Sequence, residues 1–215
     1  VTGSIAYREA RIALSEAGQE RLATVVSARR VQIESWFGEI QSDLLGQASG
    51  GATQKAAREF AKGWGKLEGD PAAYLTENYV TANPNPEGER HLLETAGDHS
   101  PYSIQHRIHH GNFVSLVQQK GYDDLYLVDV DGNVVYSVNK GADFATNVVD
   151  GVWKGTGLGT AARESLQAEG PGAIAFSDIA PYAAAGDTAA AFIATPVFSS
   201  RGEKYGAIVS RPPVT

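Results

Sequence analysis

Residues 121–137, GYDDLYLVDVDGNVVYS, decide the fold of this chain. Residues 125–128 alternate between two faces, as in a β-strand, and residues 134–136 resume a β pattern after a turn at Asp131-Gly132-Asn133. A short turn of Asp, Gly and Asn between two such segments is typical of a β-hairpin. We therefore predict two antiparallel strands joined by a tight turn.

Three further strands are predicted after this hairpin, over residues 173–176, 189–198 and 204–209. A loop rich in glycine, threonine and asparagine, 143–159, and a helix over about 158–168 connect the hairpin to the first of them. The order of elements predicts a five-stranded antiparallel sheet with helices on one side. The chain therefore belongs to the α+β class.

The N-terminal part is predicted to form one long helix over about residues 4–45. This range contains no proline, and apolar residues recur at multiples of seven, at Ile5, Ile12, Val26, Ile33 and Ile40. A helix of roughly 40 residues spans about 60 Å. Two alternatives stay open: the helix packs along its own domain, or it is a stalk that dimerises and leads from a membrane segment.

Three shorter helices follow, each with a recognisable start. We expect them to begin at Thr53, at Asp70-Pro71 and at Ser100-Pro101, and to end near Leu67, near Val80 and before Gly121.

The polar segment 81–97 lies between the last two of these helices and gives no reason to pack, so it is predicted to be a loop. We divide the chain into a helical segment, 1–99, and a core, 100–215, within one structural unit overall.

The composition excludes several classes of protein. A net charge of −7 argues against nucleic acid and gives no affinity for anionic lipid surfaces. The absence of cysteine excludes zinc ribbons, thiol catalysis and disulfide frameworks. No stretch approaches 18 consecutive apolar residues, and the chain starts at Val1. We therefore expect an excised fragment whose transmembrane helices lie outside it.

The C-terminal half resembles the Cache (PAS-like, PDC) periplasmic sensor domains of methyl-accepting chemotaxis proteins and related sensor histidine kinases. The resemblance covers about residues 101–209. The segments that carry it are 122–129, 132–137, Phe176-Ser177-Asp178, Pro181-Tyr182, 191–198 and 205–209.

This resemblance implies an extracytoplasmic sensor domain of an inner-membrane chemoreceptor, which binds a small ligand between the sheet and the loop-plus-helix before the third strand. It also implies a homodimer in the full-length receptor and signalling through the terminal helix. The alternatives are a sensor domain of a histidine kinase or cyclase, a dimerisation module without ligand, and a hydrolase that uses Asp178 with a histidine. We expect no enzyme activity and no cofactor.

The chain departs from the motif of amino-acid-binding relatives at two positions. Their Arg-x-Trp-Tyr becomes Gly151-Val152-Trp153-Lys154, and the acidic residue two positions after the tyrosine of Pro-Tyr becomes Ala184. The ammonium group of an amino acid would then be buried without a counter-charge, which is costly. We therefore predict a small carboxylate ligand, such as acetate.

Aromatic and polar side chains of the core and the glycine-rich loop are the candidate ligand-binding residues. Glycines let a backbone approach a ligand, and N–H groups at a helix N-terminus attract carboxylates. For each aromatic residue core packing is the alternative, and Asp178 has the alternative of bracing its own loop. The predicted site consists of Tyr126, Tyr136, Trp153, Thr156, Gly157, Phe176, Asp178, Tyr182, Phe192 and His109.

A metal site is not expected, although His106, His109 and His110 share one face of a helix. His106 and His110 have the i, i+4 spacing of some zinc ligands, but no Glu follows His106 and no third ligand is evident.

Overall fold

A computed structural model describes the backbone of residues 2–214 and the side chains of residue 19 and residues 21–214. The described chain forms two compact units, 2–42 and 43–214. Helix α1 (Thr2–Ser49) makes up the first unit and ends in the second. The long N-terminal helix is thus confirmed, and side chains 21–35 are exposed along it. Within the described residues, no helix is long and apolar enough to cross a membrane.

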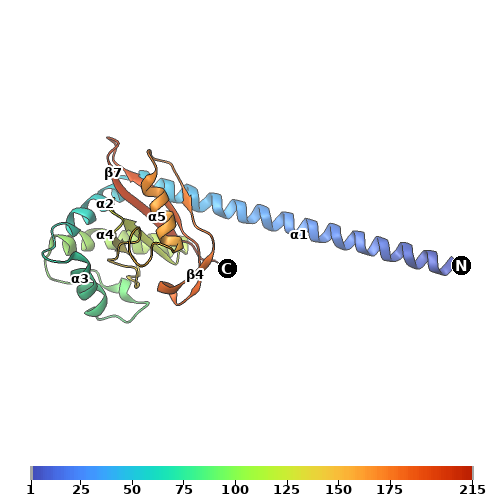
Figure 1. Cartoon of the computed structure of the whole chain (residues 1–215), viewed down its shortest axis with the longest axis horizontal. Helices are drawn as coiled ribbons and strands as arrows, with labels where there is room; N and C mark the ends of the chain where they lie inside the picture. Colours follow the sequence, from blue (N-terminus) through green and yellow to red (C-terminus); the bar gives the residue numbers. More distant parts are fainter. Residues whose placement is uncertain (1, 215) are drawn as a thin grey trace. The chain divides into compact units, whose positions relative to one another are not determined.

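The second unit is built around a five-stranded antiparallel sheet, as predicted (Figure 1). The strand order is β2-β1-β7-β6-β3, so the first and last long strands of the core lie side by side at its centre. The α+β class is confirmed. The strands are β1 (Asp124–Val128), β2 (Val134–Ser137), β3 (Ala175–Phe176), β6 (Ile193–Phe198) and β7 (Lys204–Arg211).

Helices cover both faces of this sheet. Tyr126 of β1 pairs with Ser137 of β2, and the next residue of β1 pairs with Tyr136. Because side chains alternate along a strand, Tyr126 and Tyr136 point to opposite faces. The Tyr136 ring lies 4.8 Å from Phe60 of α2 (Gly51–Trp64) and 5.1 Å from Phe113 of α4 (Pro101–Lys120).

Helix α5 (Gly157–Gln167) contacts β6, β7 and β3 on the Tyr126 face, where Gly157 lies against Phe192. The expectation of helices on one side of the sheet is therefore wrong. Gly157, at the start of α5, lets this helix approach the sheet closely. The order of elements alone did not specify which face of the sheet α5 covers.

Two of the three predicted helix starts are confirmed. Asp70 accepts a hydrogen bond from the Ala72 N–H at the start of α3 (Pro71–Thr76), which continues as a π-helical turn, Glu77–Thr81. Ser100 accepts from the Ser103 N–H at the start of α4. The helix α4 ends at Gly121, whose φ of 66° is the left-handed conformation that favours glycine at this position.

The start of α2 differs from the prediction. The helix begins at Gly51, with Gly50 as its N-cap, and Thr53 is buried inside the first turn. A threonine side chain here packs against the core, so it is not available to cap the helix.

The polar segment between α3 and α4 packs onto the core, contrary to expectation. It contains a 3₁₀ turn, Arg90–Leu92, and Arg90 donates a hydrogen bond of 3.1 Å to the Lys140 carbonyl. Its own carbonyls at His91 and Glu94 each lie 2.7 Å from a histidine nitrogen of α4. These contacts all use backbone carbonyls as acceptors, so the polarity of the side chains in the segment does not predict them.

A small second sheet was not predicted. Strands β4 (Ala180–Tyr182) and β5 (Thr188–Ala190) form a hairpin, so the predicted strand 189–198 is two strands, β5 and β6. The turn between β4 and β5 ends at Gly186, which has a φ of 66°. Strand β4 is short and contains Pro181, which weakens the β pattern in the sequence.

Candidate ligand-binding site

Four of the predicted site residues come together on the Tyr126 face of the sheet. The Tyr182 ring lies 5.7 Å from the Trp153 ring and 4.9 Å from the Phe192 ring, and Phe192 lies 6.2 Å from Tyr126. Tyr126, Tyr182 and Phe192 are buried. Four separate segments of the chain therefore meet in one aromatic cluster.

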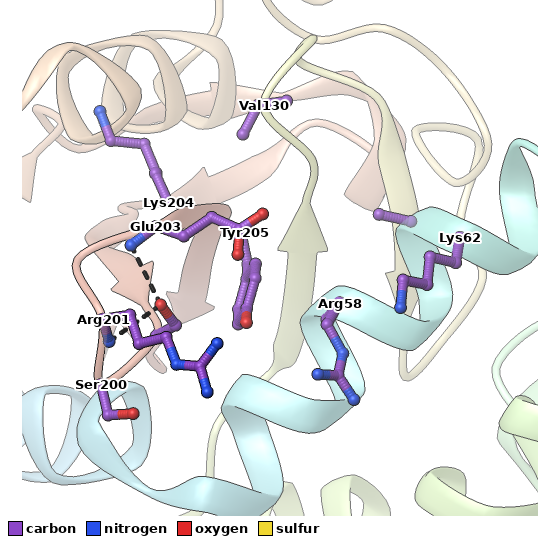
Figure 2. Close-up of a pocket in the computed structure, with 10 residues that line it drawn as sticks. Arg58, Lys62, Val130, Ser200, Arg201, Glu203, Lys204 and Tyr205 are labelled. Atoms are coloured by element: carbon purple, nitrogen blue, oxygen red, sulfur yellow. Dashed lines mark hydrogen bonds between the residues drawn. The ribbon is translucent and has the colours of Figure 1, made fainter.

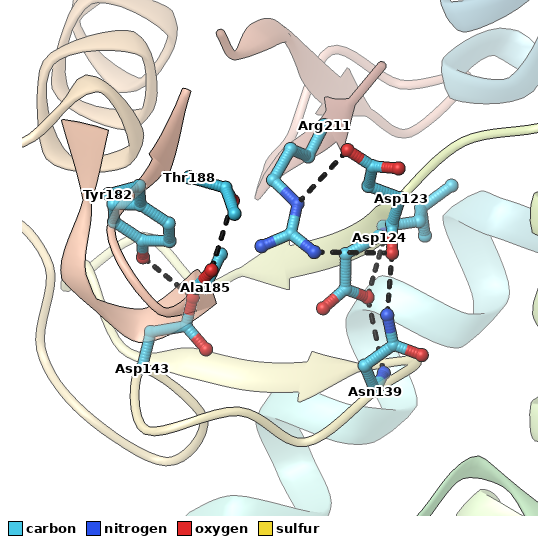
Figure 3. Close-up of polar contacts among 9 residues, drawn as sticks. Asp123, Asp124, Asn139, Asp143, Tyr182, Ala185, Thr188 and Arg211 are labelled. Carbon is cyan, nitrogen blue, oxygen red and sulfur yellow. Dashed lines mark hydrogen bonds and ion pairs between the residues drawn. The ribbon is translucent and has the colours of Figure 1, made fainter. Parts of the chain in front are cut away.

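A buried carboxylate, Asp143, lies against this aromatic cluster (Figure 3). Its Oδ2 accepts a hydrogen bond of 2.6 Å from the Tyr182 hydroxyl. The Tyr126 hydroxyl lies beside the same carboxylate and lowers its pKa by hydrogen bonding, although neither this hydroxyl nor Asp143 Oδ1 makes a hydrogen bond of ordinary geometry within the described residues. Burial raises the pKa of Asp143, and burial together with the nearby carboxylates raises the pKa of Tyr126.

A second buried carboxylate, Asp124, stands at the start of β1. Its Oδ1 accepts hydrogen bonds from the backbone N–H groups of Leu125, Val138 and Asn139, at 2.7, 3.1 and 3.2 Å. Burial, and then repulsion by Asp143, raises the pKa of Asp124 to about 7. Three N–H donors therefore do not offset the cost of burying this charge.

Arg211 is a cation of the site and stands opposite Asp124 in the backbone register of β7 and β1. Its Nη2 donates to the Asp123 carbonyl at 3.4 Å, and its Nε lies 4.0 Å from Asp123 Oδ2. Burial opposes the charge, but Tyr126 and the neighbouring carboxylates keep the pKa of Arg211 raised. In the described chain the Arg211 Nε makes no hydrogen bond. The side chain is only 13% exposed, so this guanidinium is largely buried.

The loop before α5 uses its polar groups internally. Thr156 is the N-cap of α5: its hydroxyl accepts from the Gly159 N–H and donates to the Trp153 carbonyl, at 3.4 and 2.7 Å. A Cβ added at Gly157 would lie 2.6 Å from Ser177 Oγ and 2.8 Å from Phe192 Cδ2. Thr156 and Gly157 thus serve the start of the helix and its close packing against the sheet.

The other predicted site residues lie elsewhere. Tyr136 is on the opposite face of the sheet, with its hydroxyl 2.7 Å from His110 Nδ1, and His109 packs beside Phe60 on the same face. Phe176 and Asp178 are exposed. The structure therefore places Tyr136 and His109 away from Tyr182, and Phe176 and Asp178 at the surface.

The charged residues of the site were not predicted from the sequence. Asp124 directly precedes the predicted strand residues 125–128, and Arg211 lies two residues beyond the predicted end of its strand. Asp143 stands in a loop with no motif around it. A pair of charged residues at the ends of two neighbouring strands is the signal that was available.

The opposite face holds a separate polar network around Lys140, which is fully buried. Its Nζ donates to the carbonyls of Ser137 and Val138 at 3.4 and 3.3 Å and lies 5.5 Å from the centre of the Tyr136 ring. Burial lowers the pKa of Lys140 to about 7 and that of His110 to about 3. This network stabilises the packing of α4 and contains no group of the aromatic cluster.

A surface hollow of about 690 Å³ lies between α2 and the β6–β7 turn (Figure 2). Arg58 and Lys62 line it, but both pair with Glu59, at 2.8 and 3.8 Å. Lys204 donates instead to the Leu166 and Ala168 carbonyls. Three of its four cations, Arg58, Lys62 and Lys204, are thus engaged by other groups, and the fourth is Arg201.

Comparison with known proteins gives a distant structural likeness. No protein family and no curated protein matches the sequence. The sensor domain of the histidine kinase DctB of V. cholerae is similar in structure, with 16% sequence identity and a TM-score of 0.42 over 86% of this chain. The match spans 58% of the length of that chain. A likeness of this size defines neither the fold nor the ligand of the present chain.

Proposed function

We propose that this chain is an extracytoplasmic, periplasmic ligand-sensing domain of a bacterial transmembrane chemoreceptor. The observation that carries the proposal is the buried group of Asp143, Tyr126 and Tyr182 beside the aromatic cluster, in which Asp143 Oδ1 and the Tyr126 hydroxyl make no hydrogen bond of ordinary geometry within the described residues. A buried polar atom without a partner costs about 1–3 kcal/mol. A small molecule that pairs with both offsets this cost, so the site favours the occupied state.

The position of the site agrees with the Cache resemblance, which implies a ligand between the sheet and the loop-plus-helix before the third strand. Trp153 and Asp143 both belong to the connection between β2 and β3, while Tyr126 belongs to the sheet. Ligand binding would therefore link this connection to the central strands. The sensor domain of a histidine kinase or cyclase has the same requirement and is the alternative receptor class.

The predicted carboxylate ligand finds two donors at the site. The Arg211 Nε and the Trp153 indole Nε1 are both without a hydrogen-bond partner in the described part of the chain. A guanidinium and an indole N–H are suitable donors to a carboxylate. We propose that the acid group of a small organic ligand binds to these donors.

Helix α1 is proposed to join two copies of the chain and to pass the signal to the membrane. Leu22, Val26 and Ile33 are 67%, 63% and 55% exposed. Val26 and Ile33 are seven residues apart and lie on one side of the helix. A second copy of the same helix would cover these side chains, as in a homodimer.

The test is the melting temperature of the purified domain with a panel of organic acids, amines, amino acids and purines. A ligand that binds only the folded state at roughly 100 times its Kd stabilises the fold by about 2.7 kcal/mol. We expect at least one compound to raise the melting temperature of the wild type. Glu68→Gln, at an exposed position outside the predicted site, is the control that keeps this response. A panel without any response would favour a dimerisation module that binds no ligand.

A further inference from the structure

We propose that the surface hollow between α2 and the β6–β7 turn is a second binding site, for a doubly charged oxyanion of the phosphate or sulfate type (Figure 2). This site is separate from the candidate ligand site. The hollow lies at Lys204, where β7 begins, and the candidate site lies at Arg211, where the same strand ends. The length of this eight-residue strand therefore separates the two sites.

The hollow has an excess of positive charge, although the net charge of the chain is −7. Four cationic side chains line it: Arg58, Lys62, Arg201 and Lys204. One carboxylate, Glu203, also lines the hollow, and a second, Glu59, is shared by two of the cations at 2.8 and 3.8 Å. Four positive charges thus accompany two negative ones, and a ligand with two negative charges balances them.

Two of the four cations are not paired with a carboxylate. Lys204 donates to the carbonyls of Leu166 and Ala168, which are uncharged, so its positive charge is not neutralised. Arg201 is exposed, and within the described residues its guanidinium makes no hydrogen bond and no ion pair. The donors of Arg201 are therefore free to bind a ligand, and Lys204 adds charge nearby.

The guanidinium groups of Arg58 and Arg201 lie on either side of Tyr205 (Figure 2). Glu59 and then the Tyr205 hydroxyl raise the pKa of Arg58 by hydrogen bonding, so this guanidinium stays charged beside the ring. A guanidinium is planar and binds oxyanions through two parallel N–H donors. Two such groups at one ring can hold a tetrahedral oxyanion from two sides, and the Tyr205 hydroxyl is a further donor.

Both elements that supply these guanidinium groups are ordered without a ligand. In the β6–β7 turn, Ser199 Oγ accepts from the backbone N–H groups of Arg201 and Glu203, at 3.2 and 3.0 Å. The Ser199 N–H in turn donates to the Glu203 carbonyl at 2.7 Å. Arg58 and Lys62 are four residues apart in α2, so they lie on one side of this helix. Binding of an anion here therefore does not have to order the backbone of either element.

The experiment is titration calorimetry of the wild-type chain with inorganic phosphate, sulfate, glycerol 3-phosphate and acetate at pH 8. Ionic strength is held constant, because salt screens exposed charges. We expect phosphate or sulfate to bind at least about tenfold more tightly than acetate, a difference of about 1.4 kcal/mol. Glycerol 3-phosphate distinguishes the source of the anion: it binds as well as phosphate if the site takes phosphate esters, and more weakly if the site takes the free ion.

Single variants locate the anion. Arg201→Gln, at an exposed position of the turn, should lower the affinity for phosphate or sulfate at least about tenfold, and Glu203→Gln should raise it. Arg107→Gln, at an exposed position of α4, removes the same charge elsewhere and should leave the affinity unchanged. An affinity that Arg201→Gln does not change and Arg211→Gln abolishes would place the anion at the candidate site and overturn the proposal. Equal affinities for acetate and the doubly charged anions, or no saturable binding, would also overturn it.

Discussion

The hydroxyl of Tyr182 donates a hydrogen bond of 2.6 Å to Asp143 Oδ2, across 39 residues of sequence. Tyr182 ends β4, and Asp143 belongs to the connection that follows β2. The contact therefore fastens the β4–β5 hairpin to the loop that lies over the central strands. Burial and the negative charge of Asp143 both raise the pKa of Tyr182, so its hydroxyl stays protonated and keeps its role as donor.

Replacing Tyr182 by Phe should destabilise the domain, because Asp143 Oδ2 then loses the hydrogen bond that the Tyr182 hydroxyl donates to this buried carboxylate. A lost partner of a buried charged group costs about 1–3 kcal/mol or more. Urea unfolding at neutral pH measures the change. Adding Asp143→Asn to this variant removes the charge and should restore part of the loss; a double variant no more stable than Tyr182→Phe would contradict the assignment.

The buried His110 should make the domain sensitive to acid. Burial, and then Lys140, lowers its folded-state pKa to about 3, whereas the ordinary value is 6.5. Between these values the unfolded state binds the proton and the folded state does not, so this contribution to stability is lost as the pH falls below 6.5. His110→Gln keeps an acceptor for Tyr136 and a donor for the His91 carbonyl without titrating.

The free energy of unfolding of the wild type, minus that of His110→Gln, should therefore rise with pH between about 3 and 6.5 and stay level above. The measurement is urea unfolding at a series of pH values. A difference that does not depend on pH would mean that His110 titrates normally in the fold.

The buried Lys140 should lower the free energy of unfolding at neutral pH, and this destabilisation should disappear at alkaline pH. Its folded-state pKa is lowered by burial to about 7, against 10.5 ordinarily, while Asp124 acts in the opposite sense. His106 and His110 also lie near it and are themselves held neutral by burial. Between pH 7 and 10.5 the unfolded state binds more protons, so this contribution to stability rises with pH.

Lys140→Met should therefore be more stable than the wild type at pH 7, by an amount that shrinks as the pH approaches 10.5. The positive φ of this residue, 52°, strains both side chains alike, so the pH dependence of the difference reports the charge. Thermal unfolding across this pH range is the measurement. A constant difference between the two proteins would show that the lysine stays charged when buried.

Gly206 should not tolerate a side chain. Its φ is 139°, and a Cβ would lie 2.0 Å from the Val128 carbonyl oxygen on the neighbouring strand. Gly206→Ala should thus cost about 1–3 kcal/mol or more, because the central pair of strands must separate. Gly111→Ala is the matched control: it lies in α4 with open space around it and should stabilise by about 0.5–1 kcal/mol. Equal effects of the two changes would refute the close approach.

The dimer through α1 predicts that a charge on one side of this helix prevents association. Val26→Glu with Ile33→Glu should abolish concentration-dependent dimerisation in sedimentation equilibrium, because both positions lie on the proposed contact side. Ala28→Glu with Ser35→Glu adds the same charge on the opposite side and should leave the dimer intact. Loss of association in both double variants, or in neither, would argue against this interface.

The parts of the fold with strong local signals could be predicted from the sequence. The β1–β2 hairpin and the limits of α4 follow from turn and cap residues that act on their immediate neighbours. The β4–β5 hairpin could not be predicted in this way. Its strands are three residues each, and their pairing is supported by contacts with Asp143 and Phe192 that the local sequence does not reveal.

The aromatic part of the candidate site could be predicted from the sequence, and its charged part could not. The sequence predicted the aromatic members of the site, because their residue types and positions fit the Cache resemblance. These members are Tyr126, Trp153, Tyr182 and Phe192. Tyr136 was predicted to share a site with Tyr126. In the structure Tyr126 pairs with Ser137, so Tyr136, the neighbour of Ser137, points to the opposite face of the sheet. The positions of the buried charged residues are set by tertiary contacts between distant segments, and no local sequence pattern predicts them.

The segment between α3 and α4 contacts histidines of α4 through two of its main-chain oxygens, those of His91 and Glu94. Every amino acid supplies such an oxygen, so homologues can replace His91 or Glu94 freely without losing the contacts. A single inserted or deleted residue between 91 and 94 would instead shift one oxygen away from its histidine. Natural variation here should therefore change the letters of the segment and preserve its length.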